Sequence, residues 1–169
     1  MTVTPSCFVR PFAPLDLAQI EDLNSLAFGP GRFAKTAHRL REGVAPDPAL
    51  SLVAMFGDRL GGSVTMTPVR IGAASALLLG PLAVHPDFER RGVGSTLVKT
   101  TMTLAGDLGH RLVLLVGDEA YYGTFSFRRV DGNRIVLPGP ADPKRVLMAE
   151  LAPGAFETAK GPVKNWNWA

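Results

Sequence analysis

A glycine-containing turn between an apolar run and a long amphipathic segment restricts the fold of residues 75–116 more than any other feature of the chain. Residues 75–84 lack the alternation of polar and apolar side chains that marks a half-exposed strand, so we expect a strand buried on both faces. A helix is predicted to follow, with a core-facing stripe formed by Val93, Leu97, Thr101, Leu104 and Leu108. Residues 111–116 are predicted to form a second buried strand. This order of elements indicates a right-handed crossover between strands that are parallel or nearly so.

Shorter predicted elements surround this unit. Asp16 has the position of an N-cap, and Gln19 follows three residues later in a capping-box position. The elements expected before the unit are a strand at residues 7–10, a helix that begins at Asp16 and ends before Gly29, a helix at residues 32–42, and a hairpin of strands at residues 50–56 and 60–70. Those expected after it are a short helix at residues 119–125 and closing strands at residues 127–130 and 146–151.

The length and composition of the chain suit a single globular domain. The chain has 169 residues, of which 46% are hydrophobic and 20% charged, so a disordered protein is not expected. We place the domain at residues 1–152. Residues 153–169 form a polar, irregular tail, in which Trp166 and Trp168 indicate packing on the domain or on a partner subunit, as in a homodimer.

Several classes of function do not fit the residues present. The three histidines and Cys7 lie far apart and lack the spacing of zinc ligands, so no metal is expected. Cys7 stands in an apolar run, and we expect it to be a small buried residue. No Gly-x-Ser-x-Gly turn indicates a hydrolase nucleophile. The net charge of +3 is mild and the basic residues are not clustered, which argues against a nucleic-acid partner.

The hydrophobic pattern also argues against a membrane protein. The longest apolar stretch, residues 73–84, contains a glycine and a proline and is well short of the ~20 residues that span a bilayer. No secretory signal is expected, because Thr4, Pro5 and Arg10 interrupt the pattern of a basic start followed by an apolar run. We therefore expect a cytoplasmic protein that does not bind membranes.

The turn at the start of the long helix has the properties of an anion site. Its sequence is Arg90-Arg91-Gly92-Val93-Gly94-Ser95-Thr96. The first amides of a helix lack partners within the helix, and the helix dipole adds about half a positive charge at that end. The glycines allow close approach to the backbone, and the arginines and hydroxyls supply further donors. Phosphate is the expected ligand, although such a turn can also serve only to join strand to helix.

Two familiar phosphate-binding motifs do not match this turn. The dinucleotide-binding fingerprint requires a third glycine where Leu97 stands. The P-loop requires a lysine directly before its serine or threonine, and no lysine precedes Ser95. Each motif therefore fails at the residue that carries its chemistry.

Two blocks of sequence resemble the GNAT superfamily of N-acetyltransferases, and the run from Leu79 to Phe127 is most similar to a branch of bacterial predicted members. The acetyl-CoA signature of the family resembles Leu82-Ala83-Val84-His85-Pro86 with Glu89-Arg90-Arg91-Gly92-Val93-Gly94. The family's short helix, with a tyrosine four residues before a Gly-Phe pair, resembles Gly117-Asp118-Glu119-Ala120-Tyr121-Tyr122 with Phe125-Ser126-Phe127. Two positions depart from the pattern: Glu89 replaces a glutamine or arginine, and Ser126 replaces a glycine.

The resemblance implies an α/β (α+β) fold and a co-substrate. The fold would have a mixed, mostly antiparallel central sheet with a splayed pair of parallel strands and helices on both faces. Acetyl-CoA would lie with its pantetheine arm between residues 79–84 and 112–116, paired with the main chain of Leu82 and Val84. The residues implied to bind it are Leu82, Ala83, Val84, Glu89, Arg90, Arg91, Gly92, Val93, Gly94, Ser95, Thr96, Gly117, Asp118 and Tyr122.

The resemblance also implies a reaction, the transfer of an acetyl group to a primary amine by direct attack on the thioester. The Val84 amide would polarise the thioester carbonyl, because the oxyanion needs a fixed donor where its charge develops. Tyr122 matches the position of the general acid that protonates the departing thiolate, whereas Tyr121 is expected to pack. An alkylamine has a pKa of about 10.4, so the attacking amine must also lose a proton.

The base, the acceptor and the acyl group stay open. The two helices between Asp16 and Glu42 are expected to shape the acceptor pocket. The base candidates are ordered water, Asp118, Glu119, His85 and His38. Two other hypotheses remain: a non-catalytic acyl-CoA-binding module, and an acyltransferase for another donor such as succinyl-CoA. In the second, the donor carboxylate would pair with Arg32, Lys35 or Arg39.

Overall fold

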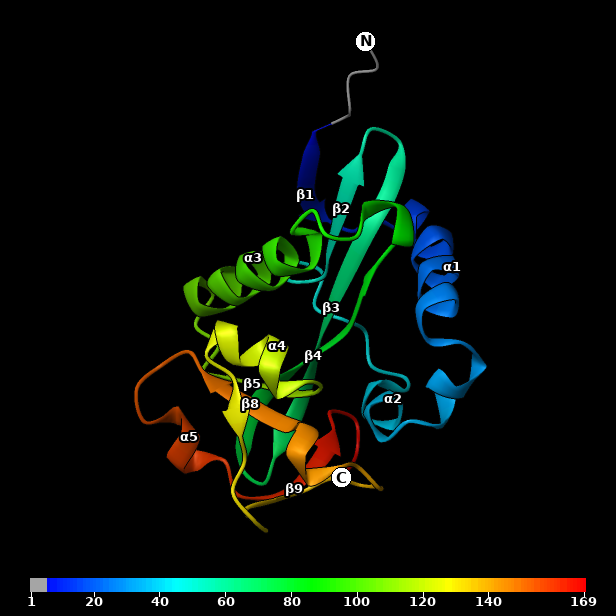
Figure 1. Cartoon of the computed structure of the whole chain (residues 1–169). Coiled ribbons are helices and arrows are strands. Elements are labelled where there is room, and N and C mark those ends of the chain that lie inside the picture. Colours follow the sequence, from blue (N-terminus) through cyan, green and yellow to red (C-terminus); the bar gives the residue numbers. More distant parts are fainter. Residues whose placement is uncertain (1–5) are drawn as a thin grey trace.

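The computed structural model of the chain describes residues 6–169, so Thr4 and Pro5 and the start of the predicted domain lie outside the described residues. Its centre is a twisted sheet that runs diagonally through the molecule (Figure 1). Along the sheet the strands are β1 (Cys7–Pro11), β2 (Leu52–Phe56), β3 (Arg59–Ile71), β4 (Ala74–Val84), β5 (Leu112–Val116), β8 (Val146–Glu150) and β6 (Arg128–Arg129). Neighbours in this order are antiparallel except β4 and β5, which are parallel.

Helices cover both faces of this sheet. They are α1 (Leu17–Phe28), α2 (Thr36–Arg41), α3 (Val93–Asp107), α4 (Glu119–Tyr122) and α5 (Ala155–Thr158). Successive side chains of a strand point to opposite faces. On β2, Leu52 and Ala54 belong to the cluster that α3 covers, whereas Val53 and Met55 pack with Leu23 of α1. The helices α1 and α3 therefore lie on opposite faces, as Figure 1 shows.

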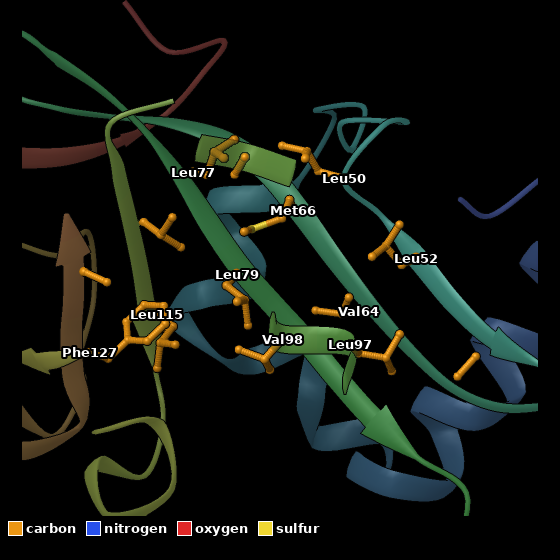
Figure 2. Close-up of a cluster of buried hydrophobic side chains, with 14 of the residues drawn as sticks. Leu50, Leu52, Val64, Met66, Leu77, Leu79, Leu97, Val98, Leu115 and Phe127 are labelled. Atoms are coloured by element: carbon orange, nitrogen blue, oxygen red, sulfur yellow. The ribbon is translucent and has the colours of Figure 1, made fainter. Parts of the chain in front are cut away.

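The main apolar core lies between α3 and the middle of the sheet (Figure 2). Leu97 and Val98 of α3 pack there against Val64 and Met66 of β3 and other strand residues. All five residues of β2 are buried, and β4 is buried from Ala76 to Gly80. The apolar run without alternation thus predicted correctly a strand covered on both faces.

The predicted fold class is confirmed. The sheet is mixed and mostly antiparallel, and the chain passes from β4 through α3 to β5, which are the parallel pair. That pair is short: its register contains only Leu77↔Val113 and Leu78↔Leu114, although both strands continue beyond these residues. The splay implied by the family resemblance is therefore present.

Asp16 stands at the N-cap position of α1, as predicted, but its side chain does not cap the helix, because the carboxylate accepts hydrogen bonds from Arg10, at 2.6 and 2.9 Å, and from the Ala13 amide, at 2.7 Å. Two other local predictions near the N-terminus are wrong. Cys7 is exposed, since β1 is an edge strand. The helix predicted at residues 32–42 is broken at Lys35, whose extended backbone (ψ 144°) separates a 3-10 turn (Pro30–Ala34) from α2.

Two predictions for the C-terminal ends of elements are also wrong. Leu108 does not face the core but is 57% exposed, because α3 ends at Asp107. The tail is not irregular: it contains α5 and a strand, β9 (Gly161–Asn165). β9 pairs with the end of β3 and with β7 (Ile135–Val136). The proposed division at residue 152 stays a prediction.

Candidate functional site

A cavity of about 710 Å³ lies where β4 and β5 part. Its floor is formed by the main chain and side chains at residues 79–82 of β4 and at residues 115–118, where β5 ends. One wall comes from α1 and α2, which cover this face of the sheet, and the opposite wall includes Tyr121 and Tyr122 of α4. The cavity therefore brings together Leu82 of the first sequence block, several residues of the second block and the first two helices.

The hydrogen-bonding pattern leaves one edge of β4 free for a ligand. The His85 amide donates to the Gly61 carbonyl at 2.8 Å, and the register pairs Ala83 with Ser63. Main-chain groups of an antiparallel strand alternate in direction, so those of Ala83 and His85 face β3 and those of Leu82 and Val84 face the opposite side. That side is the gap left by β5, in which an extended chain could pair as an additional strand.

The glycine turn presents helix amides that have no acceptor among the described residues. Gly92 is the N-cap of α3 with φ 74°, a left-handed conformation that glycine adopts without strain. Within residues 6–169 no side chain caps this helix start, and the first intrahelical bond is that from the Thr96 amide to the Gly92 carbonyl. The amides of Val93, Gly94 and Ser95 are therefore available, and with the helix dipole they form an anion site.

The two arginines of the turn are placed differently from each other. Arg90 is exposed and has a positive φ of 62°. The Arg91 guanidinium lies 5.5 Å from the centre of the Phe88 ring and 6.0 Å from that of Phe56, so it stacks on aromatic rings beside β2. Glu89 and Thr96 are exposed at the same surface. All four of these side chains are therefore exposed, and Arg91 alone also contacts aromatic rings.

Tyr121 lies closer to the turn than the sequence indicated. A Cβ placed on Gly94 would be 2.8 Å from the Tyr121 hydroxyl and 3.5 Å from the Val84 side chain. Tyr121 is partly exposed and lines the cavity, and burial raises the pKa of its hydroxyl. The lack of a side chain at Gly94 therefore lets α4 and the end of β4 meet the start of α3.

Tyr122 is less exposed than Tyr121 and is held by packing. Its ring meets that of Phe127 at an interplanar angle of 74°, with 5.9 Å between the centres, and lies against Gly117, where a Cβ would be only 2.6 Å away. Burial, as the largest cause, raises the pKa of Tyr122 to about 12, and Arg145 opposes this shift. The hydroxyl is therefore protonated at neutral pH, as a proton donor in the cavity must be.

The four side chains among the base candidates do not all reach the cavity. Asp118 and His38 line it; Asp118 also accepts a hydrogen bond from the Ala120 amide at 3.1 Å, and His38 lies 3.6 Å from Glu42. Glu119 pairs with Arg129 and His85 accepts a hydrogen bond from the Asp87 amide, and neither belongs to the lining.

Three cavity residues were not predicted individually. Glu21 of α1 pairs with Arg32 at 2.5 Å, Asn24 of α1 is 8% exposed, and Arg41 of α2 faces Gly80 of β4. No sequence motif marks Asn24 or Arg41. Helix periodicity alone does not tell which polar residue faces a ligand.

The three cationic residues suggested to pair with a carboxylate of the acyl donor do not all line the cavity. Arg32 and Lys35 line the cavity, whereas Arg39 does not. Arg39 is exposed, donates to the Pro138 carbonyl at 2.9 Å and lies over the Trp168 ring. It therefore faces the C-terminal tail.

Neither a metal centre nor a membrane span is found in the part of the chain that the structure describes. Residues 6–169 contain no group of three or more histidine, cysteine, aspartate or glutamate side chains that could hold a metal ion. None of their helices is long and apolar enough to cross a bilayer.

Comparisons with known proteins agree with this geometry. The model of the acetyltransferase (GNAT) family matches residues 17–123. The uncharacterized N-acetyltransferase YjhQ of Escherichia coli is 28% identical over 156 residues, which cover 88% of this chain and 86% of YjhQ. The structure of the Escherichia coli GNAT protein YhbS in complex with CoA superposes on this chain with a TM-score of 0.81 and 25% sequence identity. The match covers 98% of this chain and 92% of the YhbS chain. A Brucella melitensis GNAT acetyltransferase in complex with acetyl-CoA has a TM-score of 0.62 and 25% identity, and covers 89% of this chain and 98% of its own.

Proposed function

Because the chain belongs to the acetyltransferase (GNAT) family, we propose that it transfers the acetyl group of acetyl-CoA to a primary amine. The observation that carries this proposal is the splay of β4 and β5, which opens the cavity beside Tyr122, together with the uncapped start of α3, which Tyr121 of the cavity wall reaches at Gly94. Relatives of the same fold bind CoA or acetyl-CoA, which supports the choice of co-substrate.

The diphosphate of acetyl-CoA would bind the amides at Val93, Gly94 and Ser95. Pantetheine would then run back along the free edge of β4, pairing first with Val84 and then with Leu82, because Val84 is nearer in sequence to the turn. The cavity is lined by Leu82 but not by Val84. We therefore propose that the Leu82 amide donates the hydrogen bond to the thioester carbonyl. The sequence suggested the Val84 amide, which lies two residues closer to the turn.

The chemistry follows from these positions. The neutral amine attacks the thioester carbon, the carbonyl electrons move onto oxygen, and the Leu82 amide stabilises the oxyanion. When the intermediate collapses, the carbon–sulfur bond breaks and Tyr122 gives its proton to the departing thiolate. Asp118 or His38, or water held by them, would remove the proton from the amine, since both residues line the cavity.

The proposal also includes the location and the assembly of the protein. A cytoplasmic location and a homodimer remain inferences from the sequence. In the structure, Trp166 of the tail is 40% exposed and lies over Arg70, which leaves aromatic surface for a second copy. The mass in solution, measured by light scattering, tests the dimer.

Calorimetry with acetyl-CoA and release of CoA thiol in the presence of an amine panel test the function. We expect acetyl-CoA binding and thiol release that requires both an amine and Tyr122. Tight binding without acceptor-dependent release would favour the non-catalytic module instead. Release only with another acyl-CoA, such as succinyl-CoA, would change the donor, and the absence of binding to any acyl-CoA would overturn the proposal.

A further inference from the structure

Arg41 is a charged residue of the cavity that the proposed transfer does not use. It is the last residue of α2, and its Nη1 would lie 3.8 Å from a Cβ placed on Gly80, at the point where β4 leaves β5. Figure 1 shows α2 beside this part of the sheet. The guanidinium is therefore at the acyl end of the proposed cofactor site and not at its phosphate end.

The positive charge of Arg41 has no counter-charge in the described part of the chain. Its guanidinium makes no ion pair or hydrogen bond with residues 6–169, and burial, with no charged neighbour contributing, lowers the pKa of Arg41 to about 10. Arg32 on the same cavity, by contrast, is satisfied by Glu21 and by the Gly29 carbonyl at 2.7 Å. A partly buried and unpaired cation is costly to retain, and bound carboxylates are its usual partners.

The cofactor phosphates are not the expected partner of Arg41. They would bind at residues 92–95, whereas Arg41 faces Gly80, and the strand from Gly80 to Val84 lies between the two places. An extended strand rises about 3.3 Å per residue, so roughly 13 Å separate Gly80 from Val84. The acetyl group itself carries no charge. The anion must therefore come from the other substrate or from a longer acyl group.

Asn24 favours the acceptor as the source. It lines the same cavity, and its Oδ1 is buried without a hydrogen-bond partner in the described residues. Rotation about the Cβ–Cγ bond of Asn24 interchanges the positions of Oδ1 and Nδ2. The side chain can therefore turn an acceptor oxygen toward a ligand N–H. An amine with a carboxylate would supply donors to Asn24 and an anion to Arg41, whereas a dicarboxylic acyl group would supply only the anion.

We propose that Arg41 binds the carboxylate of the acceptor and that the acceptor is a free amino acid or a similar small amino acid derivative. Phe28, Phe33 and Val44 also line the cavity and would contact an apolar side chain of such a molecule. This inference rests on the proposed function, because it names the acceptor class for that reaction.

Matched pairs of substrates test the proposal. Thiol release from acetyl-CoA is measured with leucine and 3-methylbutylamine, and with phenylalanine and 2-phenylethylamine, which differ only in the carboxylate. We expect kcat/KM to be at least about 30-fold higher for the amino acids, as for a desolvated charge pair. Equal values for both members of each pair would overturn the proposal but leave the proposed function intact.

Variants then test whether Arg41 is responsible. Arg41→Gln should lower kcat/KM for the amino acid about 30-fold, through a higher KM, and should change kcat/KM for the matched amine less than about threefold. Arg41→Lys, which keeps the positive charge, should recover part of the kcat/KM for the amino acid. Arg39→Gln is the matched control, since Arg39 is exposed and outside the cavity, and it should have little effect. A similar loss for both substrates in Arg41→Gln would contradict a role in carboxylate binding.

A thermal unfolding experiment separates ligand binding from a structural role. If Arg41 awaits a ligand, Arg41→Gln leaves Tm of the ligand-free protein unchanged or raises it, because an unpaired charge is removed. Phenylalanine added to the CoA complex should raise Tm of the natural protein but not of the variant, a readout that does not depend on turnover. A lower Tm of the ligand-free variant, with no change in the shift caused by phenylalanine, would overturn the proposal.

A last comparison tests the donor. Succinyl-CoA and acetyl-CoA are compared with the same amine acceptor in the natural protein and in Arg41→Gln. We expect no preference for succinyl-CoA. A preference that disappears in Arg41→Gln would overturn the assignment to the acceptor and place the carboxylate on the acyl group. If no acyl-CoA binds at all, the proposed function fails, and the Tm response to phenylalanine alone then decides whether Arg41 binds a carboxylate.

Discussion

Tyr122 combines a fixed position with a high pKa, and both follow from its surroundings. Gly117 leaves space for the ring, Phe127 packs against it in a T-shaped contact, and burial raises the pKa to about 12. A hydroxyl with so high a pKa keeps its proton over the whole neutral range, so the proton donor is in its protonated form at the start of every turnover. Its neighbour Tyr121 is more exposed and contacts the turn instead.

Tyr122→Phe removes the hydroxyl and leaves the ring in place. We expect kcat to fall about 100-fold or more, with the Kd for acetyl-CoA within about twofold, because a general acid acts on the leaving group and not on binding. In the natural protein the rate should show no alkaline loss near pH 10 from this group, since its raised pKa keeps it protonated there. Full activity of the variant, measured as thiol release, would contradict the role.

Asp16 is buried and holds Arg10 and the Ala13 amide, and these contacts lower the pKa of its carboxyl group. A carboxyl with a lowered pKa stabilises the fold above its unfolded pKa of about 3.8, and this contribution is lost as the pH falls toward the lower folded value. Asp16→Asn should cost about 2 kcal/mol at pH 7. Urea denaturation should show the two proteins converging between pH 4 and pH 2; a constant difference would exclude this ion pair as the cause.

Individual residues mark the limit of what the sequence could predict. Gly92 and Gly94 were identified because a helix start has a known requirement for amides and space. Arg41, Asn24 and the contact of Tyr121 with Gly94 depend on which helix face the sheet covers, and that is decided by packing between distant segments. A polar side chain in a short helix carries no local sign of the cavity it faces.

Among the elements, the unit of β4, α3 and β5 was predicted best because each part has a strong pattern. Its strands are continuous apolar runs, and its helix has a regular stripe that ends near a glycine. The segment from Pro30 to Arg41 was predicted as one helix because its composition allows it, but Lys35 takes an extended conformation between two shorter turns. The strand β9 was missed because its pairing partners are far away in sequence.

The contact between α3 and α4 can be tested with a double-mutant cycle. Gly94→Ala would place a methyl group 2.8 Å from the Tyr121 hydroxyl, so that Tyr121 or the turn must shift. We expect the Kd for acetyl-CoA to rise about 10-fold, and the same change in a Tyr121→Phe background to cost clearly less, a coupling of about 1 kcal/mol. Calorimetry measures the Kd for acetyl-CoA in the single and double variants. Additive effects of the two substitutions would show that the Gly94→Ala methyl group does not clash with the Tyr121 hydroxyl.

For the molecule as a whole, the sheet connects the two substrates of the proposed reaction. The edge of β4 from which β5 has parted would bind acetyl-CoA, and the helices α1 and α2 form a wall of the cavity beside it. The C-terminal strand β9 supports this arrangement from a distance: it extends the sheet beside β3 and contacts the end of α2. The position of α2, and with it that of Arg41, therefore depends on the last residues of the chain.

Asn165 is the residue through which β9 holds α2. It is buried, and its Nδ2 donates to the carbonyls of Arg39, at 3.2 Å, and Glu42, at 2.8 Å, on either side of Arg41. Asn165→Ala leaves these carbonyls without a donor and should cost about 1–3 kcal/mol of stability. We expect KM for the acceptor to rise severalfold while the Kd for acetyl-CoA changes less than about twofold, because β4 and α3 keep their own contacts.

The control for this variant is Asn167→Ala, which removes a hydrogen bond from an exposed side chain to the Gly43 carbonyl just beyond α2. Because that donor is exposed, water can replace it, and the acceptor KM should stay close to its natural value. Steady-state kinetics and calorimetry on both variants separate local from global effects. If Asn165→Ala weakened acetyl-CoA binding as much as acceptor binding, β9 would act on the whole sheet, and the acceptor side of the cavity would have no separate support from the tail.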